Sequence, residues 1–118
     1  MKTLTFLARS APHGTGKAKA LQDMVLSAAV FEQKIQLVFL DDGVYQLLAG
    51  QDPSALPAKN VSAALPALEL YGVDRVFLDA DSLQTRGLGD SELLIPAQSC
   101  TADEIRLLIA DSDMVFSL

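Results

Sequence analysis

Hydrophobic residues in this chain gather in short continuous runs, separated by segments of mixed polarity. The runs cover residues 3–8, 35–40, 73–78, 93–97 and 114–118. Each run has the length of a strand, and its apolar residues are continuous rather than alternating with polar ones. This is typical of parallel strands that are covered on both faces. The pattern predicts about five strands in a mainly parallel sheet.

Helical periodicity fills the segment that follows the first run. Within residues 17–32, apolar side chains recur three or four positions apart and form one stripe, made of Ala18, Leu21, Val25, Ala28 and Ala29. A stripe of this kind is typical of a helix that packs on a sheet. The order strand, helix, strand favours an α/β fold.

A second helix is expected after the fourth run. Thr101 and Glu104 are spaced as in a capping box, in which each side chain satisfies a free backbone amide of the other residue. Ile105, Leu108 and Ile109 follow at helical spacing and are expected to face the sheet.

The middle of the chain gives weaker signals. Residues 44–48 suggest a short helix, and residues 51–57 suggest a loop because they include two prolines. Pro66 either begins a helix that runs to Tyr71 or kinks a longer helix that starts near Val61. No repeat or linker interrupts the chain, so we expect a single domain over residues 1–118.

Composition narrows the classes of function. Half of the 118 residues are hydrophobic and mean hydropathy is +0.28, which excludes intrinsic disorder. No apolar run reaches the roughly 18 residues of a membrane span. The net charge of −6 argues against direct nucleic-acid binding. The start of the chain lacks the apolar core of a secretory signal, so we expect a cytoplasmic protein.

The loop after the first run contains two candidate functional features. Gly14, Thr15, Gly16 and Lys17 precede a helix and could hold an anion, but they lack the full spacing of a phosphate-binding loop. We interpret them as a strand-to-helix turn. His13 could act as an acid or base near neutral pH, but the sequence identifies no partner for it, and a surface position is the simpler interpretation.

Acidic residues follow the second and third runs. Asp41, Asp42, Asp79 and Asp81 could gather at one edge of a sheet and bind magnesium, as in receiver domains or phosphatases with a DxD motif. Receiver domains, however, carry the acidic pair on the first strand, and DxD phosphatases begin their core with that motif. A magnesium-dependent phosphoryl-transfer domain therefore stays an alternative, and we expect no metal or cofactor.

Cys100 is the only cysteine, so it can form no disulfide within the chain. It lies just before the expected capping box, where a helix N-terminus could lower its pKa and favour a thiolate. A thiolate could carry a persulfide, whereas a buried cysteine would be inert.

Several segments of the chain, taken together, resemble the DsrE/DsrF-like sulfur-relay family, and within it the DsrF-like subunits. The resemblance covers nearly the whole length and is carried by residues 10–14, 42–51, 70–73 and 82–88. The stretch DGVYQLLAGQ is the most specific of them. The resemblance implies a flavodoxin-like three-layer α/β/α fold.

The resemblance also implies a function and partners. In the family's bacterial relay, three homologous subunits form a heterohexamer that passes persulfide sulfur toward tRNA wobble-uridine 2-thiolation or within sulfur oxidation. The expected partners are a DsrE/TusD-like and a DsrH/TusB-like chain, and the isolated chain is expected to form homo-oligomers.

The resemblance places the sulfur-carrying cysteine of the DsrE-like subunit at or near Asp79 of this chain, a few residues before the pair Arg86 and Gly87. An aspartate cannot carry a persulfide. The sequence therefore predicts a non-catalytic subunit, with a standalone persulfide carrier using Cys100 as the alternative.

Overall fold

The computed structural model describes residues 2–11, 16–31, 33–48, 67–73, 75–89 and 92–118. Its five strands are β1 (Thr3–Ala8), β2 (Lys34–Phe39), β3 (Arg75–Asp79), β4 (Gln98–Cys100) and β5 (Met114–Ser117). All of them pair in parallel, in the order β4-β3-β2-β1-β5. The expected α/β class with a five-stranded parallel sheet is confirmed.

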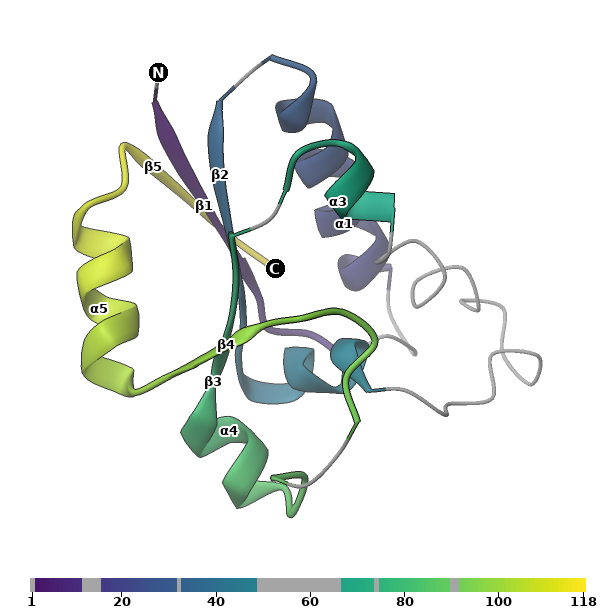
Figure 1. Cartoon of the computed structure of the whole chain (residues 1–118), viewed down its shortest axis with the longest axis vertical. Helices are drawn as coiled ribbons and strands as arrows, with labels where there is room; N and C mark the ends of the chain where they lie inside the picture. The colour runs from purple at the N-terminus through teal and green to yellow at the C-terminus, as the bar shows by residue number, and fades with distance from the viewer. Residues whose placement is uncertain (1, 12–15, 32, 49–66, 74, 90–91) are drawn as a thin grey trace.

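Helices cover both faces of the sheet (Figure 1). They are α1 (Lys17–Ala29), the 3-10 helix η1 (Asp41–Leu47), α3 (Ala67–Leu70), α4 (Ala80–Thr85) and α5 (Ala102–Ala110). Strands β1 to β4 step in one direction through right-handed connections, which places α1 and α3 on one face. The chain then returns to lay β5 beside β1, so α5 lies on the opposite face. The layers are those expected, while the strand order differs from that of flavodoxin.

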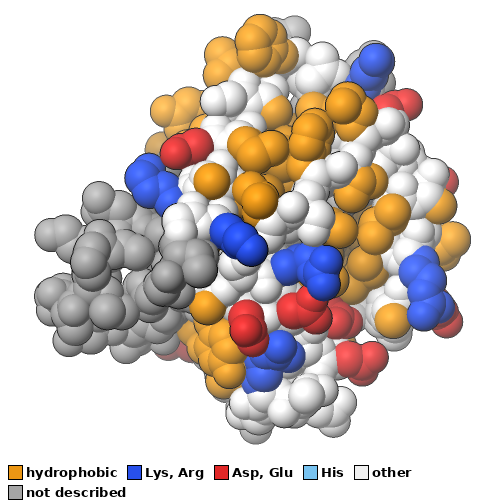
Figure 2. All heavy atoms as spheres, turned by 180° about the vertical axis from the view of Figure 1, so that it is seen from behind, with side chains coloured by type: hydrophobic (Ala, Val, Ile, Leu, Met, Phe, Trp, Pro, Cys, Tyr) orange, Lys and Arg blue, Asp and Glu red, His pale blue; other side chains and the backbone are white. Residues whose placement is uncertain are grey.

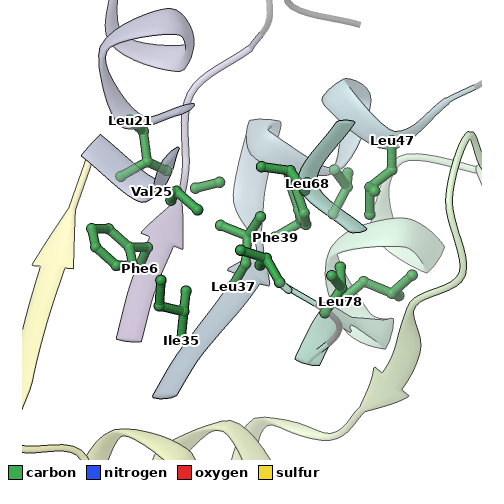
Figure 3. Close-up of a cluster of buried hydrophobic side chains, with 13 residues drawn as sticks. Phe6, Leu21, Val25, Ile35, Leu37, Phe39, Leu47, Leu68 and Leu78 are labelled. Carbon is green, nitrogen blue, oxygen red and sulfur yellow. The ribbon is translucent and has the colours of Figure 1, made fainter. Parts of the chain in front are cut away.

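The core has one part on each side of the sheet, because successive strand residues point to opposite faces. The larger part lies under α1 and α3 and includes Phe6, Phe39 and Leu78 (Figure 3). The smaller part lies under α5 and contains Leu7, Val38, Phe77, Cys100 and Ile105. Apolar residues on both faces explain why the strand signals were continuous.

The two helices expected from an apolar stripe and from a capping box, α1 and α5, both form. In α5, Thr101 Oγ1 accepts a hydrogen bond from the Glu104 amide at 3.2 Å, and Glu104 Oε1 accepts one from the Thr101 amide at 2.9 Å. The capping box is therefore confirmed. Helix α1 begins at Lys17 but ends at Ala29, short of the expected residue 32, and Phe31 beyond it is 73% exposed.

The expected fourth strand, residues 93–97, is wrong. Leu93 forms only an isolated antiparallel bridge with Leu48, and the strand that joins the sheet is β4. Pro96 has no amide hydrogen to donate to a ladder. The apolar residues of this segment instead pack against the larger part of the core. The sequence did not predict β4, because Gln98 and Ser99 are polar and exposed at the edge of the sheet and so give no apolar run.

The short helices differ in detail from the expectation. The helix expected over residues 44–48 is η1, which starts at Asp41. Helix α4 was not predicted, because Asp79 and Asp81 at its start suggested a loop. Helix α3 covers Ala67–Leu70, and the two alternatives for Pro66 concern residues outside the described part of the chain. Within the described residues, no helix is long and apolar enough to cross a membrane.

Candidate site at the carboxyl ends of the strands

The carboxyl ends of β1, β2 and β3 meet at one edge of the sheet, where open α/β folds place their ligands. Asp79 is the last residue of β3, and its Oδ2 accepts a hydrogen bond from Ser82 Oγ at 2.6 Å. Ser82 Oγ in turn accepts a hydrogen bond from the Asp41 amide at 2.9 Å. This chain of bonds joins the end of β3 to the loop after β2. The second oxygen of Asp79, Oδ1, is buried and has no hydrogen-bond partner among the described residues.

Two arginines form ion pairs with the two aspartates that follow β2. Arg9 Nε lies 3.0 Å from Asp41 Oδ2, and Arg86 donates from Nε and Nη2 to Asp42 Oδ1 at 3.1 and 3.0 Å. Arg86 Nη1 also donates to the Ser82 carbonyl at 3.2 Å. Asp81 is exposed in the first turn of α4. The described residues contain no group of three or more acids, histidines or cysteines placed to hold a metal ion.

Gly43 and Gln46 bring the loop after β2 against the end of β1. A Cβ built on Gly43 would lie 1.7 Å from the Ala8 carbonyl oxygen, so only glycine allows this approach. Gln46 is 1% exposed, and its side-chain amide donates to the Ser10 carbonyl at 2.9 Å. Both residues belong to the DGVYQLLAGQ stretch, which is the sequence signal that marks them, although their structural role was not foreseen.

Cys100 lies beside Asp79 and is closed off from solvent. The two residues are paired on adjacent strands, and Cys100 is 3% exposed. Burial raises the pKa of the Cys100 thiol above its ordinary value, and the carboxylates of Glu104 and Asp79 raise it further. The expectation that the N-terminus of α5 would lower this pKa is wrong, because desolvation disfavours the thiolate.

Only some of the candidate residues in the loop after β1 belong to the described part of the structure. His13, Gly14 and Thr15 lie outside the described residues. Lys17 lines a polar pocket of about 280 Å³ between the ends of β1 and β5, together with Arg9, Ser10, Asp41, Ser117 and Leu118. Neither Asp79 nor Cys100 is among the described residues that line this pocket with Lys17.

Comparison with known sequences shows the family of this chain. Residues 2–118 match the sequence profile of the DsrE/DsrF-like family. The chain belongs to this family. A protein called TusC homolog from Vibrio parahaemolyticus is 39% identical over 106 residues, which cover 90% of each chain. The intracellular sulfur oxidation protein DsrF of Allochromatium vinosum is 43% identical over 94 residues, which cover 80% of this chain and 69% of DsrF.

Comparison with solved structures supports the same fold. The YchN protein of Escherichia coli aligns over 100% of both chains with a TM-score of 0.87 and 22% identity. At this identity the likeness concerns the fold alone. This DsrE/DsrF-like chain therefore shares the fold of YchN, and in it Asp79 at the end of β3 is held by Ser82 with Cys100 buried beside it.

The role of Ser82 can be tested by removing its hydroxyl. Ser82→Ala is expected to lower the free energy of unfolding by about 1–3 kcal/mol, because it leaves the Asp41 amide and both Asp79 oxygens without partners. Urea denaturation measures this change. Ser27→Ala, at an exposed position on α1, is the control and should change stability by less than about 0.5 kcal/mol. Equal effects of the two substitutions would contradict the assigned network.

The burial of Cys100 predicts low reactivity. At pH 8 the native thiol should react with a disulfide reagent at least about tenfold more slowly than in urea, because it is protonated and covered. Because burial raises the pKa of the thiol, the native rate should still be rising at a pH at which a free thiol is fully ionised. Rapid native labelling at neutral pH would show an exposed thiolate and contradict the assignment.

Proposed function

We propose that this chain is a non-catalytic subunit of a cytoplasmic sulfur-relay complex, in which cysteines of other subunits carry the persulfide. The observation that carries the proposal is that a member of the DsrE/DsrF-like family has an aspartate, Asp79, at or near the position where the resemblance places the carrier cysteine. The relatives named TusC and DsrF support a relay role.

Persulfide transfer needs an accessible thiolate. The thiolate of the acceptor attacks the outer sulfur of the donor persulfide, a new S–S bond forms, and the donor leaves as a thiolate, with no net oxidation. Asp79 has no sulfur and is held by Ser82. Cys100 is the sole cysteine of the chain, and it is buried with a raised pKa. Neither residue meets the requirement.

The proposed partners are homologous DsrE/TusD-like and DsrH/TusB-like subunits, with two copies of each of the three chains in a heterohexamer. The complex would serve tRNA wobble-uridine 2-thiolation, as in the resemblance to TusC, or sulfur oxidation, the process in the name of the DsrF relative. The net charge of −6 supports sulfur transfer through protein partners rather than direct contact of this chain with RNA.

Assembly can be tested by co-expressing this chain with homologous DsrE/TusD-like and DsrH/TusB-like chains from the same organism. Native mass spectrometry should give a hexamer with two copies of each chain. Expression of the two partners without this chain is the control, and it should give smaller assemblies. A chain that stays monomeric both alone and mixed with the partners would contradict the proposal.

A further inference from the structure

Helix α5 buries fewer side chains against the sheet than α1, which covers the opposite face (Figure 1). Ile105 is the one buried residue of α5, whereas α1 buries four residues. Leu108 and Ile109 of α5 are only partly buried, and Leu107 is 65% exposed. In the view from behind, where α5 lies at the right, hydrophobic side chains remain on the surface around it (Figure 2). The apolar burial that holds α5 on the sheet is therefore small.

Two buried oxygens without hydrogen-bond partners lie on the face of the sheet that α5 covers. Gln36 is 3% exposed, and its Oε1 has no partner among the described residues. Asp79 Oδ1 is the second such atom. Because side chains alternate along a strand, Gln36 shares a face with Val38 and Asp79 shares it with Phe77, and both apolar residues belong to the part of the core under α5. A buried oxygen without a partner destabilises the closed arrangement and gains hydrogen bonds when water reaches it.

The two oxygens lie near opposite ends of α5. Gln36 is paired in register with Thr5, whose hydroxyl forms a hydrogen bond with the Ser112 hydroxyl just after the helix. Asp79 is paired with Cys100, which lies two residues before the helix begins. Movement of α5 away from the sheet would therefore bring water to both oxygens and would uncover the Cys100 thiol.

We propose that α5 is a hinged cover over Cys100, which opens as a local unit while the five-stranded sheet stays folded. In the open form β4 remains paired with β3, and Ser112 releases the Thr5 hydroxyl. Opening is rare, so Cys100 reacts slowly, but its exposure does not require unfolding of the whole chain. The inference concerns the isolated chain and does not depend on the sulfur-relay role.

Labelling of Cys100 by a disulfide reagent at low urea concentrations tests the inference in the wild type. Below the unfolding transition, the labelling rate should exceed the product of the unfolded-state rate and the unfolding equilibrium constant by at least about tenfold. The rate should also change little with urea, because a local opening exposes little surface. In hydrogen exchange, amides 106–110 of α5 should be at least about tenfold less protected than amides 21–25 of α1. A labelling rate equal to that product, or equal protection of the two helices, would overturn the proposal.

The oxygen of Gln36 can be tested by Gln36→Leu, which keeps a side chain of similar size. Labelling of Cys100 should slow at least about fivefold, because the closed form of the variant no longer buries an oxygen without a partner. Gln98→Leu, at an exposed position of β4, is the control and should leave the rate within about twofold of the wild type. Labelling of Gln36→Leu that is no slower than that of the wild type would contradict the proposal.

A matched pair of truncations separates α5 from the rest of the core. Ile105→Ala and Leu21→Ala remove the same number of carbon atoms from buried positions on α5 and α1. Ile105→Ala should speed the labelling of Cys100 at least about tenfold, whereas Leu21→Ala should leave the rate within about twofold, because only the first weakens the closed form of α5. Where an alanine variant does not fold, Ile105→Val and Leu21→Val replace the pair, with an expected acceleration of at least about threefold for Ile105→Val alone. Equal acceleration by the two members of a pair would show that exposure follows global unfolding and would overturn the proposal.

Discussion

Gly43→Ala is expected to lower the free energy of unfolding by about 3 kcal/mol or more, enough to leave little folded protein. The added Cβ would lie 1.7 Å from the Ala8 carbonyl oxygen and 2.5 Å from its carbon. These are backbone atoms of the buried strand β1, so relief requires the η1 loop to move away from the sheet. Thermal or urea unfolding of the purified variant measures the loss.

Gly89→Ala is the matched control for this prediction. Nothing lies within 4 Å of a Cβ at Gly89, and its backbone has no positive φ angle. Its unfolding free energy should therefore stay within about 1 kcal/mol of the wild type. Near-normal stability of Gly43→Ala would mean that η1 does not pack against the end of β1 as described.

Phe39→Ala is expected to cost about 3–5 kcal/mol of unfolding free energy. Phe39 is 1% exposed on the central strand β2, between Ala8 of β1 and Leu78 of β3, and its removal opens a cavity in the larger part of the core (Figure 3). Under the proposed function, the yield of the assembled complex should fall in parallel, because this subunit contributes structure rather than chemistry.

Phe31→Ala removes the same side chain from an exposed position. Phe31 is 73% exposed beyond the end of α1, so the substitution should change stability by less than about 0.5 kcal/mol. Chemical denaturation of both variants gives the comparison. Similar losses at Phe39 and Phe31 would contradict the position of the core.

The sequence predicted the elements whose signals are local and apolar. Strands β1, β2 and β3 are buried on both faces, and α5 begins with a capping box, so each could be located from its own residues. Strand β4 could not, because its place in the sheet comes from pairing with β3 rather than from an apolar run. Residues 93–97 were wrongly predicted as a strand because they form an apolar run. They are apolar because they pack against the core from outside the sheet.

The candidate site was predicted in part. The sequence placed Asp79 and the acidic pair at the ends of strands, but it gave no means of knowing that Arg9 and Arg86 bind those acids. Both arginines reach residues more than thirty positions away in the chain, and such contacts depend on strand order. The pKa of Cys100 was predicted in the wrong direction because the sequence showed the nearby helix N-terminus but not the burial.

The central claim is that this subunit carries no sulfur itself. It is tested most directly by loading the reconstituted complex with isotopically labelled persulfide and mapping the label by mass spectrometry in the wild type and in Cys100→Ala. We predict label on a cysteine of a partner subunit, none on Cys100, and onward transfer within about twofold of the wild-type rate in the variant. Stoichiometric persulfide on Cys100, together with loss of transfer in Cys100→Ala, would contradict the account and make this chain a carrier.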